Sequence, residues 1–230
     1  MTIRERFTRW YQELRSYLRP MTFRQKAAYL FTYYKSWLLG LILIAVAIGF
    51  GVEVMIQRQQ ETVLQGFFTN DDYGIFDAAA IRKDFEKRIT LESNQNIILD
   101  DDLYIDLEGG ARNYSAASNG KIIAYMSVGQ VDFIVTCREI FDHYSGNVPM
   151  MDMRQLLPED LYREMEPYLA MGRNFDEDGN LLESCPVAIE LSQSRYLRDQ
   201  QIPQGTYYLF VPYQAPNRDM ICSFIRYSFE

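Results

Sequence analysis

The only histidine of the chain, His143, lies six residues after Cys137, and a thiol next to an imidazole is the pair on which cysteine nucleophiles depend. The segment between them reads as the end of a strand followed by a helix, so the two side chains do not share a face. The sequence carries no Gly-x-Gly-x-x-Gly, Walker or Gly-x-Ser-x-Gly motif. We therefore expect a protein that is not an enzyme and that uses no cofactor or metal.

A second pattern has the spacing of a calcium-binding EF-hand loop. Asn174, Asp176, Asp178 and Gly179 match its first positions, but the twelfth position, which should be a bidentate glutamate, is Cys185. An Asp-Gly pair between apolar segments is also a hairpin signal. We expect a solvated hairpin tip rather than a calcium site.

An aromatic stretch offers residues for a binding pocket. Tyr207, Tyr208 and Tyr213, with Phe210 among them, could line a pocket for a sugar or a peptide. A strand in the protein core explains about half of these aromatic residues equally well, because alternate side chains of a strand point inward.

The three cysteines, Cys137, Cys185 and Cys222, could form one disulfide and leave one free thiol, or form none. A bridge between Cys185 and Cys222 would close a loop of about 37 residues, but spacing does not determine the pairing.

An apolar stretch precedes all of these residues. Residues 36–56 contain a single charge, Glu53, and 21 residues in a helix cover about 31 Å, which is close to the thickness of a hydrocarbon core. This predicts one transmembrane helix. A cleaved signal peptide is the alternative, but 35 residues precede the apolar run and its only Ala-x-Ala lies inside it. We expect an uncleaved signal anchor.

Charge predicts the orientation of this helix. Residues 1–35 hold eight basic and two acidic residues, a net +6, whereas residues 36–230 hold fifteen basic and twenty-nine acidic residues, a net −14. The positive-inside rule then places the N-terminus in the cytoplasm and the C-terminal domain outside the cell membrane. Tyr33, Tyr34 and Trp37 are expected at the inner membrane interface.

Two segments could hold partners. Ala45 with Gly49, and Ala47 with Gly51, are spaced four apart, which would let a second copy or a partner helix approach closely; Gly and Ala are also simply common in membrane helices. Within residues 1–35, an apolar stripe predicts a basic amphipathic helix on a lipid surface or a cytoplasmic partner, and Thr22 with Gln25 predicts a capping box. The stripe comprises Ile3, Phe7, Trp10, Leu14 and Leu18.

Residues 57–230 alternate between strand and helix patterns, which predicts one α/β domain with a mixed sheet. Its acidic charge argues against nucleic acid as a partner. We expect strands at 63–68, 96–106, 131–136, 187–191 and 206–212, and a hairpin at 175–182. We expect helices at 77–90, 115–128, 138–144, 152–169 with a break at Pro158, and 192–199, and a last helix capped by Asn217.

Two parts of this domain resemble a known family. The order of a helix, Gly129-Gln130-Val131-Asp132 and an apolar strand looks like the Gly-x-x-Asp passage of type II periplasmic (solute) binding proteins. The strand at 207–211, Pro216-Asn217 and the final helix are similar to the C-terminal part of those proteins. The resemblance implies a reduced solute-binding lobe, although the chain lacks a lipobox cysteine and the domain is about half the usual size. The family's ligand residues vary and cannot be carried over; Asp132 joins the three tyrosines as a candidate ligand residue.

These patterns lead to two hypotheses. The first is a membrane-anchored, non-enzymatic accessory subunit that binds a small solute or peptide beside a transporter. The second is a structural or assembly component of a membrane protein complex, whose outer domain binds no small ligand. A deep aromatic cleft would favour the first hypothesis, and a filled cleft with an apolar patch would favour the second.

Overall fold

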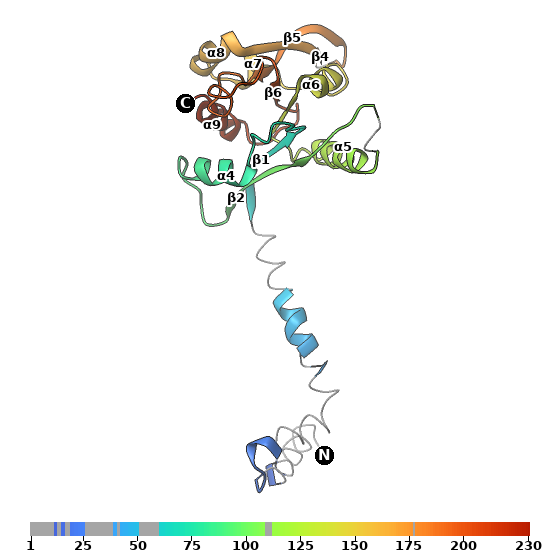
Figure 1. Ribbon diagram of the computed structural model, residues 1–230, viewed down its shortest axis with the longest axis vertical. Helices are drawn as coiled ribbons and strands as arrows, with labels where there is room; N and C mark the ends of the chain where they lie inside the picture. Colours follow the sequence, from blue (N-terminus) through green and yellow to red (C-terminus); the bar gives the residue numbers. More distant parts are fainter. Residues whose placement is uncertain are drawn as a thin grey trace. The chain divides into compact units, whose positions relative to one another are not determined.

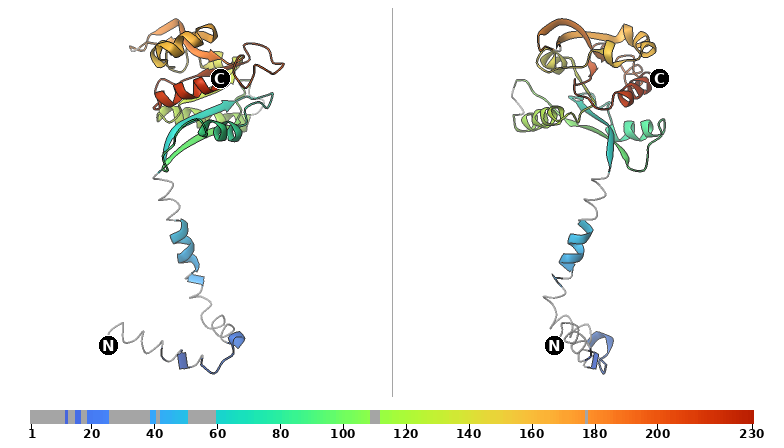
Figure 2. Two further views of the ribbon diagram at one scale, coloured as in Figure 1. Left: turned by 90° about the vertical axis from the view of Figure 1, so that its left-hand side faces the viewer. Right: turned by 180° about the vertical axis from the view of Figure 1, so that it is seen from behind.

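The computed structural model describes residues 12, 15–16, 19–25, 39–40, 42–50, 60–108, 112–176 and 178–230. The chain divides into two compact units, Met1–Gln59 and Gln60–Glu230. Figure 1 and Figure 2 show their ribbons.

Among the described residues, no helix is both long enough and apolar enough to cross a membrane. The prediction of a transmembrane signal anchor over 36–56 is therefore wrong. For the same reason, it is wrong to predict a single-pass cell-membrane protein with a cytoplasmic N-terminus and an extracytoplasmic domain.

Other predictions for the first unit have mixed outcomes. The Thr22 amide donates to Oε1 of Gln25 over 2.9 Å at the start of a helical segment, as the capping box predicts. Ala45, Ala47 and Gly49 lie on described helical residues, and a Cβ added to Gly49 would meet no atom within 4 Å. Helix pairing there stays a prediction. Several predicted residues lie outside the described part of the chain: Tyr33, Tyr34, Trp37, Gly51 and the whole apolar stripe of residues 1–35.

The second unit is an α/β domain with a six-stranded mixed sheet, as the alternating patterns predict. The strands lie in the order β2-β1-β3-β6-β5-β4. β1, β2 and β3 are parallel, whereas β6 is antiparallel to β3, β5 to β6, and β4 to β5. The strand bounds are β1 Glu61–Thr69, β2 Gln95–Leu103, β3 Phe133–Cys137, β4 Leu169–Phe175, β5 Leu181–Glu190 and β6 Tyr207–Phe210.

Helices cover both faces of this sheet (Figure 1). One face packs against α4, α7, α8 and α9 through a core that contains Phe85, Phe133 and Phe224. The other face packs against α5 and α6 through a core that contains Ile122 and Phe141. The helix bounds are α4 Ala78–Glu86, α5 Arg112–Ser127, α6 Arg138–Tyr144, α7 Met153–Leu156, α8 Glu159–Met165, the 3₁₀ turn Glu166–Tyr168 and α9 Arg218–Phe229.

The differences from the predicted elements have local causes. The segment 192–199 forms consecutive turns instead of a helix, and the Glu190 carboxylate accepts the Ser192 amide at its start over 3.0 Å. The expected helical segment over 152–169 stops earlier, and the chain enters β4 at Leu169. Asn217 precedes α9 but its side chain does not cap that helix, because it bonds elsewhere.

Candidate functional site

Asp132, predicted as a ligand residue, is fully buried and engaged within the domain. Its Oδ2 accepts the Gln65 amide over 2.7 Å and Nδ2 of Asn217 over 3.0 Å, and its Oδ1 accepts the Asn217 amide over 3.0 Å. Burial raises the pKa of the Asp132 carboxyl, and the hydrogen bonds from Asn217 and Gln65 act against that rise. The geometry thus makes Asp132 a clamp between β1 and the start of α9.

Tyr207 and Tyr208 lie in the core, on opposite faces of β6. The Tyr207 hydroxyl donates to Oδ1 of Asp71 over 3.2 Å. The Tyr208 ring stacks on Phe141 with centroids 5.0 Å apart, and its hydroxyl accepts Nη1 of Arg138 over 2.9 Å. Both rings are packed in the core and do not line a pocket. For Tyr207 and Tyr208, the alternative interpretation, a strand in the protein core, therefore holds.

The carboxyl ends of β1 and β3 form a topological switch point, because the chain leaves β1 for the face of α4 and leaves β3 for the face of α6. Ligands of open α/β sheets often bind at such an edge. Here the Thr69 hydroxyl donates to Oγ1 of Thr136 over 2.7 Å, and the Asn70 side chain exchanges two hydrogen bonds with the backbone of Ile105. Thr69, Thr136 and Asn70 therefore have hydrogen-bond partners within the domain.

Of the three tyrosines predicted to line a pocket, Tyr213 alone is exposed, with an exposed fraction of 50%. It follows β6, which runs against β1 and β3, so it lies at the edge opposite the switch point. Two adjoining hollows flank it and share Tyr213 and Pro149. We call them the apolar hollow and the acidic hollow. The apolar hollow, about 250 Å³, is lined by Ile123, Met126, Ser127, Val148, Pro149, Pro212, Tyr213 and Gln214. The acidic hollow, about 450 Å³, is lined by Asn147, Pro149, Phe175, Asp176, Gly179 and Tyr213.

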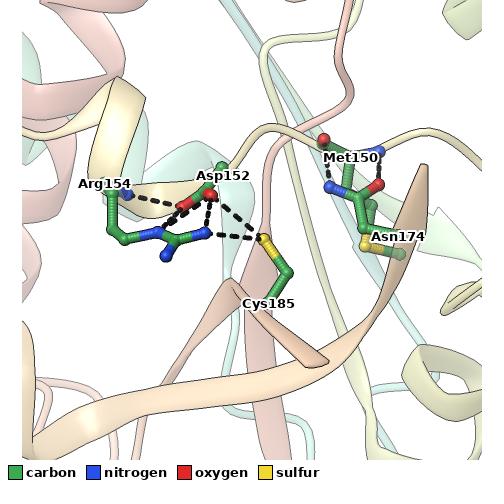
Figure 3. A network of polar contacts seen from close by, with 5 residues as sticks. All are labelled: Met150, Asp152, Arg154, Asn174 and Cys185. Atoms are coloured by element: carbon green, nitrogen blue, oxygen red, sulfur yellow. Dashed lines mark hydrogen bonds and ion pairs between the residues drawn. The ribbon is translucent and has the colours of Figure 1, made fainter. Parts of the chain in front are cut away.

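A short antiparallel pairing holds the shared wall of the two hollows in place. The Tyr213 amide donates to the Pro149 carbonyl over 3.1 Å, and the Met151 amide donates to the Val211 carbonyl over 2.7 Å. On the other side, the Asn174 side chain accepts the Met150 amide and donates to the Met150 carbonyl, as Figure 3 shows. An amide side chain thus completes the backbone pairing at Met150 and fixes the position of Pro149.

The sequence predicts some of the residues that line these hollows as apolar positions of a helix. Ile122, Ile123 and Met126 read as apolar positions of one helix, yet Ile122 is fully buried whereas Ile123 has an exposed fraction of 51%. The sequence did not predict that Pro149 and Pro212 line a hollow, because their proximity depends on long-range pairing.

The EF-hand-like residues form the turn between β4 and β5, and the predicted hairpin is confirmed. Oδ1 of Asp176 accepts the amides of Asp178 and Asn180 over 3.0 and 2.7 Å, and Oδ2 accepts Nδ2 of Asn180 over 3.0 Å. Asn174 points instead to Met150. The described residues contain no group of three acidic, cysteine or histidine side chains placed to hold a metal ion.

Cys137 and His143 lie at opposite ends of α6, with Cys137 at its N-cap and His143 in its last turn. All three cysteines are free thiols. Figure 3 shows that the Cys185 thiol donates to Oδ2 of Asp152 over 3.1 Å, while Arg154 forms an ion pair with the same carboxylate. Burial and the neighbouring carboxylate raise the pKa of the Cys185 thiol, so it is a poor nucleophile.

Thiol titration tests this arrangement. With an aromatic disulfide reagent, native protein should release one equivalent first, from the half-buried Cys137, and two more only after denaturation, because Cys185 and Cys222 are buried. Burial also raises the pKa of Cys137, so even this first reaction should be slower than that of a free cysteine peptide. A Cys137→Ser variant should lose the first equivalent. Fewer than three thiols in denatured, unreduced protein would show a disulfide instead.

Comparison of the chain with protein-family models, with curated proteins and with solved structures found no match. The resemblance to solute-binding proteins therefore stays a prediction.

Proposed function

We propose that residues 60–230 form a binding module that docks a segment of a partner protein over the two hollows beside Tyr213. The observation that carries the proposal is a half-exposed tyrosine set among exposed or partly exposed apolar side chains and two prolines, on a wall fixed by hydrogen bonds. A rigid aromatic side chain of this kind supplies contact area at a low entropy cost.

The chemistry of the apolar hollow suits a protein segment. It offers mainly carbon atoms from Ile123, Met126, Val148 and the prolines, with few polar groups to orient a sugar or an amino acid. Burying one leucine-sized side chain there would contribute about 1.5–3 kcal/mol. That contribution is enough for an anchor residue, whereas small-molecule sites combine apolar walls with several convergent polar groups.

The position of the aromatic residues also favours partner docking over solute binding. Of the tyrosines expected to line a solute pocket, Tyr207 and Tyr208 are core residues. Both hollows are open to solvent rather than enclosed between lobes. This arrangement favours the second sequence-based hypothesis, a structural or assembly component, because Tyr213 is the one residue of the predicted solute pocket that lines these hollows.

Selection from a random dodecapeptide phage library against the full chain tests the proposal. We expect peptides that bind the wild-type chain and bind Tyr213→Ser at least about tenfold more weakly, since an anchoring aromatic contributes about 1.4 kcal/mol or more. Tyr73→Ser is the matched control, because Tyr73 is exposed to a similar degree but follows β1 at the opposite edge.

Two results would contradict docking at this surface. The first is a selection that yields only peptides indifferent to Tyr213→Ser. The second is a thermal shift with amino acids or sugars that Tyr213→Ser abolishes while no peptide binds, which would restore the solute-binding hypothesis.

A further inference from the structure

The acidic hollow adds a charge to the proposed docking surface. Asp176 lines it, and the turn holds its carboxylate through three hydrogen bonds from Asp178 and Asn180. The Asn180 hydrogen bonds, and then that of Asp178, lower the pKa of the Asp176 carboxyl, so it is ionised at neutral pH. A negative charge therefore stands at a fixed place beside Tyr213.

The carboxylate still has room for a partner. A carboxylate offers about four acceptor sites, and the turn occupies three of them. Asp176 lines the hollow itself, so a donor that enters the hollow can reach the remaining site.

Among the described residues, no lysine, arginine or histidine forms an ion pair with Asp176. On β4, the Arg173 guanidinium donates to the Ser145 carbonyl over 3.2 Å and is turned toward Gly146. In the turn itself, Asp178 adds a second exposed carboxylate. Residues 60–230 as a whole hold 28 acidic and 14 basic residues, a net −14. Both the local and the overall charge thus favour a cationic partner.

We infer that the docked segment carries an apolar side chain for the apolar hollow and, beyond the Tyr213 ring, a lysine or arginine for Asp176. This inference rests on the proposed function and specifies its partner as a basic, apolar peptide segment. The two hollows share the Tyr213 ring and Pro149, so one extended chain that crosses the ring places one side chain in each. The apolar contact supplies the larger part of the affinity, and the ion pair supplies selection between partners.

The test uses the tightest Tyr213-dependent peptides from the library selection and the full-length chain. These peptides should be enriched in lysine and arginine near an apolar residue. Replacing that basic residue with glutamine should weaken binding about threefold to fivefold, the range of a partly exposed ion pair of about 0.7–1 kcal/mol. Asp176→Asn should weaken binding of the parent peptide by a similar factor. It should leave binding of the glutamine peptide unchanged. An asparagine Oδ1 can still accept the turn amides, so the hairpin keeps most of its hydrogen bonds.

Asp199→Asn is the matched control, since it removes the same charge from an exposed site that lines neither hollow. A loss with Asp199→Asn equal to that with Asp176→Asn would show that only the overall charge matters and would overturn the inference. Tyr213-dependent peptides without a basic preference would also overturn it, while leaving the proposed function intact. If no peptide depends on Tyr213, the proposed function fails and this inference fails with it.

Discussion

Replacing Asp132 with alanine should lower the free energy of unfolding by about 3–5 kcal/mol, the largest loss expected from a single polar substitution in this domain. The side chain is fully buried, and it accepts hydrogen bonds from the amides of Gln65 and Asn217 and from the Asn217 side chain. Alanine would leave two backbone N–H groups without their acceptor. Each such group costs about 1–3 kcal/mol when it stays buried.

Two further variants distinguish the loss of the Asp132 hydrogen bonds from the loss of side-chain volume as the cause of the lower stability. Asn217→Ala removes one donor but keeps the backbone amide, so it should cost only about 1–2 kcal/mol. Asp132→Asn keeps the shape of the side chain but turns an NH₂ group toward N–H donors, so it should cost nearly as much as alanine. Urea denaturation followed by far-ultraviolet circular dichroism measures all three losses. A loss below about 1 kcal/mol for both Asp132 variants would show that the clamp contributes little to stability.

Gly66→Ala should cost about 2–3 kcal/mol, because a Cβ on this buried strand would lie 2.1 Å from Cζ of Phe133. The surrounding side chains prevent the Phe133 ring from moving away from the new Cβ. The ring is fully buried, stacks on Phe224 with centroids 4.4 Å apart, and meets the edge of Phe68 at 5.9 Å. Glycine is therefore required in β1 as space for a ring from the neighbouring strand.

A double-mutant cycle tests this cause. Phe133→Leu shortens the side chain that the new Cβ would meet, so it should cost less in the Gly66→Ala background than in the wild type, with a coupling of about 1 kcal/mol or more. Gly120→Ala is the control, since a Cβ there would meet no atom within 4 Å, and in helix α5 it should raise stability by about 0.5–1 kcal/mol. Strictly additive losses at Gly66 and Phe133 would argue against the contact as the cause.

The partners of these two residues show where sequence reasoning stops. The Gly-x-x-Asp pattern marked Asp132, and the expected cap marked Asn217, but nothing in either local pattern joins residues 85 positions apart. Asn217 precedes α9 as predicted, yet its side chain makes no capping hydrogen bond, and its Nδ2 donates to the buried carboxyl of Asp132 instead. Long-range pairing thus changed the function of a correctly identified residue.

Charge and hydropathy patterns also misled at the N-terminal unit. The apolar run over 36–56 and the charge difference around it predicted a membrane span, but no described helix has the length and apolarity that a crossing requires. Composition measures how apolar a segment is, whereas a membrane crossing also requires a helix of about 20 mainly apolar residues.

The sequence by itself determined most elements of residues 60–230, but not the turns at 192–199. Period-two and helical spacing of apolar residues located the parallel strands, α6 at its observed bounds and the hairpin at Asp178-Gly179, because those patterns depend on near neighbours in the chain. Tertiary structure alone decided which tyrosines are core and which one is surface. The chain has three tyrosines within seven positions, Tyr207, Tyr208 and Tyr213. Helices packed on both faces of β6 bury the first two. The pairing of residues 149–151 with 211–213 leaves the third exposed beside two hollows.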